Sequence, residues 1–340
     1  MKSLFITAPG STEIREVAKP EPGPGQVRVR VNFLGFCGSD LNTFRGFNPL
    51  VSYPRVPGHE LAGVIDSVGP DVGSEFAPGT QVIVVPYTNC GACSSCRKGR
   101  PNACRDNQTL GVQRDGALTE EIVVPATKLL TSRRLSLRDM VLVEPLSVGW
   151  HAASRGRAAA GETVVVFGCG MVGLGAIAGA SAAGARVVAV DVDDGKLAIG
   201  RRAGAAETIN SKTENLHERL QTLTDHHGPD LLIEGVGLPE TFRACVDEVC
   251  FAGRVVYVGY AKEPVEYATK NFVMKEIDIM GSRNATADDF RGVIAYLEAG
   301  RFPVDAVVTH VVPFADAGAA LAMWVKNPGA VTKIVVEFAR

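Results

Sequence analysis

The pattern of apolar positions changes character near the middle of the chain. Between residues 26 and 124, short runs rich in valine and isoleucine alternate with Gly, Pro, Asn and Asp; the clearest runs cover residues 27–31, 82–86 and 121–124. Short strands separated by turn residues are typical of a compact antiparallel unit. We therefore expect a β-rich domain in the first part of the chain.

From residue 162 the apolar runs become continuous, over residues 163–167, 186–191, 230–234 and 254–258, and stretches rich in Ala, Leu, Glu and Arg separate them. This alternation indicates an α/β domain, in which helices cover both faces of a doubly wound parallel sheet. The tail after residue 282 predicts a helix over 287–300, a strand near 307–310, a helix over 314–326 and a strand over 332–337. The tail is too short to fold alone, and we expect it to rejoin the first domain.

The first continuous strand runs directly into a glycine-rich turn, and an Ala-rich helix follows it to about residue 184. The turn consists of Gly168, Cys169, Gly170, Met171, Val172 and Gly173. A G-x-G-x-x-G turn in this context holds the pyrophosphate of a dinucleotide on the helix N-terminus. Asp191 ends the next strand, where a carboxylate accepts hydrogen bonds from the adenosine ribose and repels a 2′-phosphate. The pattern predicts NAD rather than NADP, and the position of Asp191 argues against an unrelated glycine-rich turn.

The composition excludes several classes of protein. The 340 residues suffice for roughly two domains, and a formal net charge of −2 gives no electrostatic reason to expect nucleic acid or a membrane as partner. The apolar start is too short for a secretory signal, and no apolar run approaches the ~20 residues that cross a bilayer. We expect a cytoplasmic protein, whose eight cysteines are thiols or metal ligands before disulfides.

Four of the cysteines lie close together in the sequence: Cys90, Cys93, Cys96 and Cys104. This spacing suits a closed, tetrahedral zinc site with a structural role. An iron–sulfur cluster is the rival metal site, although the ferredoxin-type motif has a shorter last gap followed by Pro. Disulfides are the alternative without a metal, and a reducing compartment disfavours them. We expect structural zinc.

A second set of ligand-type residues is dispersed: Cys37, His59, Glu60 and Glu144. Each has an ordinary interpretation by itself, as a packed cysteine, a turn histidine, or an acidic residue at a turn or helix boundary. Together they offer a sulfur, a nitrogen and an oxygen, which are the three protein ligands of a catalytic zinc with an open fourth position. The oxygen ligand is Glu144 or Glu60, and Glu144 is slightly favoured.

These motifs, in this order, resemble the zinc-containing medium-chain alcohol dehydrogenases, and the resemblance spans nearly the whole chain. It rests on residues 37–40, 58–60, the four-cysteine cluster, residues 144–148 and the glycine turn. Glu144 stands where many alcohol dehydrogenases carry a cysteine ligand, so the chain looks most similar to the sorbitol, threonine and sugar-acid branch. Segments 52–56, 281–286 and 308–310 resemble bacterial enzymes that oxidise hexonates such as L-galactonate or L-gulonate at C5.

The resemblance implies a GroES-like catalytic domain over residues 1–149 and 283–340, with a Rossmann domain inserted over residues 150–282. It implies an NAD-dependent enzyme with two zinc ions per chain, a small-molecule substrate, and a homodimer or homotetramer. Val258 and Arg283 are then expected to contact the cofactor, and Ser39 to receive the proton of the alcohol. Asp40 is expected to orient His59.

One position departs from this branch, and it concerns the proton relay. Relatives usually carry a histidine five residues after the ligand cysteine, at the end of the relay. Here Asn42 occupies that position, and an amide does not accept and release a proton near neutral pH. The relay then ends in water or at another base, and the pH optimum is expected to shift upward.

A zinc ion in the dispersed site would lower the pKa of a bound hydroxyl, so that an alkoxide forms near neutrality and hydride passes to nicotinamide. The hexonate resemblance suggests a substrate carboxylate held by Arg283 or Arg55, because a guanidinium binds a carboxylate bidentately. For Arg55, pairing with a neighbouring acid is an equally good interpretation. A plain polyol or threonine-type substrate is the alternative within the branch.

Two alternatives fall outside that branch. A redox-inactive NAD-binding sensor or structural protein would not need an open metal site, so the retention of Cys37, His59 and Glu144 argues against it. Enoyl and quinone reductases of the same fold lack both zinc sites. Metal content separates all of these possibilities.

Overall fold

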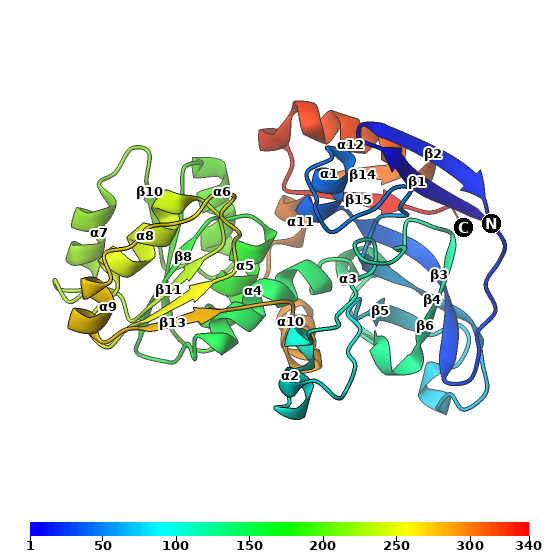
Figure 1. Cartoon of the computed structure of the whole chain (residues 1–340), viewed down its shortest axis with the longest axis horizontal. Coiled ribbons are helices and arrows are strands. Elements are labelled where there is room, and N and C mark those ends of the chain that lie inside the picture. Colours follow the sequence, from blue (N-terminus) through cyan, green and yellow to red (C-terminus); the bar gives the residue numbers. More distant parts are fainter. Residues whose placement is uncertain (340) are drawn as a thin grey trace. The chain divides into compact units, whose positions relative to one another are not determined.

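The computed structural model describes residues 1–339 (Figure 1). The chain divides into two compact units, one formed by residues 1–144 together with the segment from residue 304 onward, and the other by Pro145–Pro303. No helix within residues 1–339 is long and apolar enough to cross a bilayer.

The first unit is built around a seven-stranded sheet in the order β14-β15-β3-β4-β5-β7, with β6 paired to β3. Its central strand, β3 (Gln26–Gly35), pairs antiparallel with β4 (Glu60–Val68) on one side and with β15 (Lys333–Glu337) on the other. The last strand of the chain thus lies in the sheet of the first unit. The other strands are β5 (Gln81–Val84), β6 (Glu121–Pro125), β7 (Leu129–Leu130) and β14 (Val308–Pro313), with β1 (Lys2–Ala8) and β2 (Ser11–Glu16) in a separate hairpin.

The core of this unit forms where apolar side chains of the strands meet. Val27, Val29 and Val31 of β3 are at most 1% exposed, and they pack in one cluster with Leu61 and Ile65 of β4. This alternation is the period-2 pattern of a sheet with one buried face. The helices of the unit are α1 (Gly38–Phe44), α2 (Ser94–Arg97), α3 (Leu137–Met140), α11 (Val304–Val307) and α12 (Ala317–Lys326).

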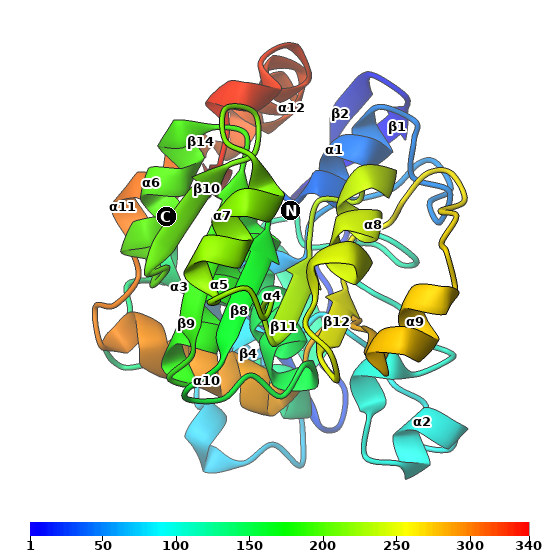
Figure 2. The same cartoon turned by 90° about the vertical axis from the view of Figure 1, so that its left-hand side faces the viewer.

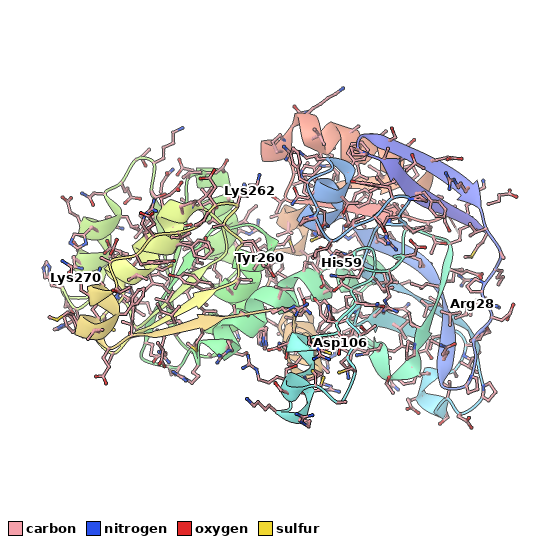
Figure 3. The ribbon with its side chains drawn as sticks, viewed as in Figure 1. Arg28, His59, Asp106, Tyr260, Lys262 and Lys270 are labelled. Atoms are coloured by element: carbon pink, nitrogen blue, oxygen red, sulfur yellow. The ribbon has the colours of Figure 1, made fainter. Side chains whose placement is uncertain are left out.

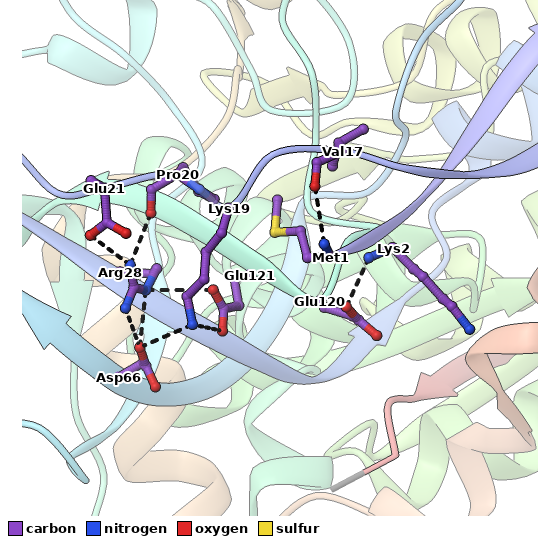
Figure 4. A network of polar contacts seen from close by, with 10 residues as sticks. All are labelled: Met1, Lys2, Val17, Lys19, Pro20, Glu21, Arg28, Asp66, Glu120 and Glu121. Atoms are coloured by element: carbon purple, nitrogen blue, oxygen red, sulfur yellow. Dashed lines mark hydrogen bonds and ion pairs between the residues drawn. The ribbon is translucent and has the colours of Figure 1, made fainter.

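A charged network crosses three strands of this sheet around Arg28 (Figure 4). The Arg28 guanidinium lies 2.7 Å from Asp66 Oδ2 and 2.8 Å from Glu21 Oε2, and Lys19 Nζ lies 2.8 Å from Glu121 Oε1. The side chain of Arg28 is only 10% exposed, so its charge needs these partners. The network fastens the segment before β3 to the surface of the sheet.

The second unit contains a six-stranded sheet in the order β10-β9-β8-β11-β12-β13 (Figure 2), and every neighbouring pair is parallel. The chain fills the sheet from β8 outward to β10 and then from β11 outward to β13. The gap between β8 and β11 is therefore the switch point where doubly wound sheets bind ligands, at their carboxyl edge. The strands are β8 (Thr163–Phe167), β9 (Arg186–Asp191), β10 (Glu207–Asn210), β11 (Leu231–Glu234), β12 (Arg254–Tyr257) and β13 (Asp278–Gly281).

The middle strands of this sheet are buried on both faces, which confirms the predicted cover of helices. Residues 164–167, 187–190 and 231–234 are all buried. Helix α5 is made mostly of small buried residues, which allows close packing on the sheet. The helices are α4 (Val143–Arg155), α5 (Met171–Ala182), α6 (Asp194–Arg202), α7 (Leu216–Leu223), α8 (Pro239–Glu248), α9 (Lys270–Lys275) and α10 (Ala287–Glu298).

The domain boundary differs from the expected one, because α10 belongs to the second unit and the chain leaves that unit only at Pro303. Tyr296 of α10 packs edge-on against Trp150, with ring centroids 5.7 Å apart, and its hydroxyl donates to the Ala203 carbonyl at 3.0 Å. The buried face of α10 is thus committed to this unit. The apolar pattern of a helix does not specify which domain it covers. The expected boundary at residue 283 therefore lies 21 residues before Val304, where the chain returns to the first unit.

Candidate functional site

Three of the four dispersed ligand-type residues meet in the first unit. One ligand atom each of Cys37, His59 and Glu60 lies within 4.8 Å of the other two. His59 and Glu60 are 5% and 0% exposed, and His59, which Figure 3 labels, has no hydrogen-bond partner for its Nδ1 among the described residues. A buried nitrogen without a partner beside a thiol and a carboxylate is the donor set that a zinc ion takes.

Asp40 holds the two ligand-bearing segments together. Its Oδ2 accepts the Cys37 N–H at 2.9 Å, and its Oδ1 accepts the Gly58 N–H at 2.9 Å. Gly58 has φ of 97°, and a side chain there would collide with Leu34, so the turn before His59 requires glycine. The hydrogen bonds of Asp40 thus run to the backbone of both segments, whereas the sequence suggested that it orients the His59 ring.

Glu60 is bound by a residue that the motifs did not reveal. Lys333 Nζ donates to Glu60 Oε1 at 2.8 Å and to Oε2 at 2.5 Å, and also to the Phe36 carbonyl at 2.9 Å. Lys333 is 2% exposed. The signal in the sequence is a lysine at the first position of a strand whose next three residues are apolar, but its partner lies 273 residues away.

Glu144, in the first turn of α4, is buried and accepts a hydrogen bond from the Tyr87 hydroxyl. Burial raises the pKa of Tyr87 well above its usual value, and Glu144 raises it further, so Tyr87 stays a donor. Burial opposes protonation of His59, yet Cys37, Asp40 and Glu144 together raise its pKa well above the ordinary value. This environment attracts a cation.

The sequence singled out three further residues near this site: Ser39, Asn42 and Arg55. Ser39 Oγ is buried and has no hydrogen-bond partner among the described residues, so it is available to a substrate hydroxyl. Asn42 is exposed. Arg55 pairs with Asp115 Oδ1 at 3.1 Å and donates to Ser52 Oγ at 3.2 Å, which is the neighbouring-acid interpretation considered for this residue.

The four clustered cysteines converge in the same unit. The Sγ atom of Cys93 lies 3.5 Å from that of Cys96 and 3.8 Å from that of Cys104, and Cys104 Sγ lies 3.6 Å from Cys90 Sγ. A zinc–sulfur distance of about 2.3 Å gives a tetrahedron with sulfur–sulfur edges of about 3.8 Å. The cluster therefore fits one zinc ion, whereas four irons and their sulfides would hold the thiolates further apart.

In the second unit, the glycine turn has the geometry of a phosphate cradle. Gly168 has φ of 91°, and a Cβ on Gly173 would lie 1.7 Å from the Gly168 carbonyl oxygen. Gly170 is the N-cap of α5, and Met171 and Val172 are the first two residues of that helix. A Cβ on Gly170 would meet no atom within 4 Å. The open space at Gly170 and the helix N-terminus behind it suit a pyrophosphate.

The remaining cofactor candidates follow other strands at the same edge of the sheet. Asp191 ends β9, where its Oδ2 accepts the Cys169 N–H at 2.7 Å and its Oδ1 accepts the Val192 N–H at 2.7 Å. Val258 and Arg283 follow β12 and β13. Because all six strands are parallel, these residues lie along one edge, on both sides of the switch point.

Comparison with known proteins covers both units. The model of the alcohol dehydrogenase GroES-like domain matches residues 23–134, and that of the zinc-binding dehydrogenases matches residues 171–299. L-galactonate-5-dehydrogenase of Escherichia coli K12 is 32% identical over 338 residues, with 99% of each chain covered. Sorbitol dehydrogenase of Bacillus subtilis 168 is 33% identical over 288 residues, which cover 83% of this chain and 81% of that one.

A solved structure shows the same similarity. The short chain alcohol dehydrogenase RspB from Escherichia coli CFT073, in complex with NADH, has a TM-score of 0.91 and 32% sequence identity, and the match covers 99% of both chains. At this level of identity the likeness extends beyond the fold to the arrangement of the two domains along the sequence.

Proposed function

Because the chain belongs to the zinc-binding dehydrogenases with an alcohol dehydrogenase GroES-like domain, we propose that it uses NAD to oxidise a secondary alcohol of a sugar acid, at C5 of a hexonate, to the ketone. The reaction passes a hydride from the carbinol carbon to nicotinamide. The observation that carries this proposal is the convergence of Cys37, His59 and Glu60 around one point. A polyol is the alternative substrate.

In this proposal Cys37, His59 and Glu60 hold the catalytic zinc, and Glu144 faces the same space from the side of Tyr87. When bound, zinc supplies a Lewis acid that lowers the pKa of a hydroxyl at its open position. Ser39 accepts the proton of the substrate hydroxyl at its otherwise unpartnered Oγ and passes its own hydroxyl proton on to water or another base. Lys333 compensates the buried charge of Glu60, and Asp40 keeps the two ligand segments in register. Cys90, Cys93, Cys96 and Cys104 hold a second, structural zinc.

The choice of cofactor rests on Asp191. A carboxylate at the end of β9 accepts hydrogen bonds from the ribose hydroxyls and repels a 2′-phosphate. Asp193 and Asp194 follow it, and they add negative charge where NADP would carry its extra phosphate. This charge pattern supports NAD as the cofactor.

Replacing Asp191 with alanine is expected to raise the dissociation constant of NAD by a factor of about 5 to 150, which corresponds to about 1–3 kcal/mol of lost hydrogen bonding. Discrimination against NADP should fall, because the repelling charge is gone. Titration of both cofactors by intrinsic fluorescence measures the two constants. Asp193→Ala is the comparison variant: it removes the cap of α6 and one flanking charge but keeps the carboxylate of Asp191, so it should weaken the preference for NAD less than Asp191→Ala does.

Two further features belong to this proposal. The edge strand β13 has no partner on its outer side among the described strands. In the same unit, three large apolar side chains are exposed to solvent: Phe251, Val273 and Met274. An open strand edge and exposed apolar side chains both favour association, which supports a homodimer or homotetramer. Both proposed zinc sites need cysteines in the reduced, deprotonated form. The cytoplasm keeps cysteines reduced, which supports a cytoplasmic location.

The carboxylate of the proposed substrate calls for a cation, and Arg283 is the first candidate. Arg55 pairs with Asp115, which is the other interpretation considered for it. Arg283 follows β13 and precedes Asn284, which adopts φ of 52°. The expected result is a kcat/KM for a hexonate well above that for the matching neutral alditol, and a loss of this preference in Arg283→Lys, because an ammonium group does not bind a carboxylate bidentately.

An NADH absorbance assay with hexonates and alditols tests this substrate. Arg55→Lys is the control and should keep the preference for the acid. Equal turnover of hexonate and alditol by the unchanged protein would mean that the substrate is a polyol. No turnover of either class would remove the proposed function.

A further inference from the structure

A buried carboxylate that the proposed mechanism does not use lies at the switch point of the second unit. Glu234 is the last residue of β11, the strand beside the glycine-turn strand β8, and it is 0% exposed. Its Oε1 accepts the Val236 N–H, the Gly237 N–H and the Thr241 hydroxyl, each at 2.8 Å. These three hydrogen bonds fix the conformation of the loop that follows β11.

The other carboxylate oxygen faces the neighbouring loop. Glu234 Oε2 has no hydrogen-bond partner among the described residues, and a Cβ on Gly259 would lie 2.4 Å from it. The Val258 and Gly259 N–H groups donate to the Glu234 carbonyl at 2.9 and 3.1 Å. The loop after β12 therefore lies directly against this carboxylate, and the close approach requires glycine.

The loop after β11 also touches the glycine turn. A Cβ on Gly168 would lie 3.0 Å from Val236 Cγ2, and the Gly235 N–H donates to the Phe167 carbonyl at 3.2 Å. Glu234 is therefore connected to the loops that follow β8, β11 and β12. These three loops form the carboxyl edge at the switch point, where ligands of doubly wound sheets bind.

The polarity of the sheet indicates which part of the cofactor lies near Glu234. If Asp191 at the end of β9 holds the adenosine ribose and the turn after β8 holds the pyrophosphate, the rest of the dinucleotide extends across β11 and β12. That half carries the nicotinamide ring, which is positively charged when oxidised and neutral when reduced. No ion pair of Glu234 is present within residues 1–339, and a buried carboxylate without a counter-charge attracts a cation.

We propose that Glu234 is a positioning residue that holds the loops after β11 and β12 for the nicotinamide half of the cofactor, and that its negative charge favours the oxidised over the reduced ring. The proposal rests on NAD being the cofactor. Oε1 shapes the loop through three donors, while Oε2 keeps the charge next to Gly259. Glu234 touches neither the ring nor the substrate, and it acts through its charge and through these loops.

The test is equilibrium binding of NAD⁺ and NADH to Glu234→Gln, without substrate. Glutamine keeps the volume and an acceptor oxygen for the three donors, and it removes the charge. We expect the dissociation constant of NAD⁺ to rise about tenfold, because the attraction between the carboxylate and the positively charged ring is lost. The constant for NADH should change less than about twofold, because the reduced ring is neutral.

Fluorescence titration gives the constant for NADH, and displacement of NADH gives that for NAD⁺. Thr241→Val is the matched control, because it removes one donor to the same oxygen and leaves the charge; it should keep the ratio of the two constants. Glu234→Asp is the second variant, needed if Glu234→Gln does not fold. It keeps the charge, so it should preserve the ratio of the NAD⁺ and NADH dissociation constants even where both cofactors bind more weakly.

An equal weakening of NAD⁺ and NADH binding in Glu234→Gln would overturn the charge effect and leave Glu234 with a structural role alone. An unchanged ratio and unchanged constants would overturn the whole inference while the proposed function stands. Failure of the unchanged protein to bind either nicotinamide dinucleotide would instead overturn the proposed function, and the inference with it.

Discussion

Serine in place of Cys37 is expected to leave the protein folded and to lower kcat/KM for alcohol oxidation by at least about a thousandfold. The thiolate is the sulfur ligand of the proposed catalytic zinc, and Lewis-acid activation of the substrate by a metal is worth several kcal/mol, each 1.36 kcal/mol being a factor of ten in rate. The fold should persist because Asp40 binds the backbone N–H of residue 37 and not its side chain. Steady-state kinetics and circular dichroism measure the two effects.

Metal content links this loss of activity to its cause. Elemental analysis of the unchanged protein should show close to two zinc ions per chain, and Cys37→Ser should retain one. Cys93→Ser is the matched control: it should also retain one zinc, but its main effect should be a lower thermal midpoint, because structural zinc supplies folding energy. Zinc near zero in the gently purified protein, or full turnover by Cys37→Ser, would contradict the assignment.

Replacing Lys333 with methionine is expected to lower the free energy of unfolding by about 3–5 kcal/mol, the cost of leaving one member of a buried ion pair without its partner. Glu60 is 0% exposed, and both its oxygens lie within 2.8 Å of Lys333 Nζ. Without the lysine, the buried carboxylate must stay charged without this partner or take up a proton. Urea unfolding followed by circular dichroism measures the change.

The double variant Glu60→Gln with Lys333→Met should recover much of this loss, because a buried pair replaced by uncharged groups is often close to neutral in stability. Lys326→Met is the control for the loss of a lysine as such, since Lys326 lies exposed at the end of α12. If the double variant is no more stable than Lys333→Met, the two side chains do not act as a pair.

The secondary structure and the local motifs could be predicted from the sequence because each depends on neighbouring residues. The continuous apolar runs at 163–167 and 186–191 are β8 and β9, and the Cys90–Cys104 cluster has sulfur distances that fit one zinc. The same holds for the last strand, which is β15 over Lys333–Glu337. Strand period, turn residues and close spacing of ligands all act over short stretches of chain.

What the sequence did not reveal depends on distant parts of the chain meeting. Tyr87 lies 57 residues from Glu144, and Lys333 lies 273 residues from Glu60, so no spacing rule connects them. The sequence also favoured Glu144 over Glu60 as the oxygen ligand, whereas the structure groups Glu60 with Cys37 and His59. The antiparallel register of β3 and β4 brings Glu60 close to Cys37, because Gly35 stands opposite Glu60.

The pairing of β3 with β15 has a consequence for the order in which a nascent chain matures on the ribosome. Residues 145–303 form a complete unit and are free to fold while the last strand is still being synthesised. The last part of the central strand β3, residues 33–35, must wait for residues 335–337 before its edge is covered, and Glu60 lacks its lysine partner until Lys333 emerges. An exposed strand edge invites association with other chains. The N-terminal domain is thus the last to finish, and losing only the final strand would leave it with both an open edge and an unbalanced charge.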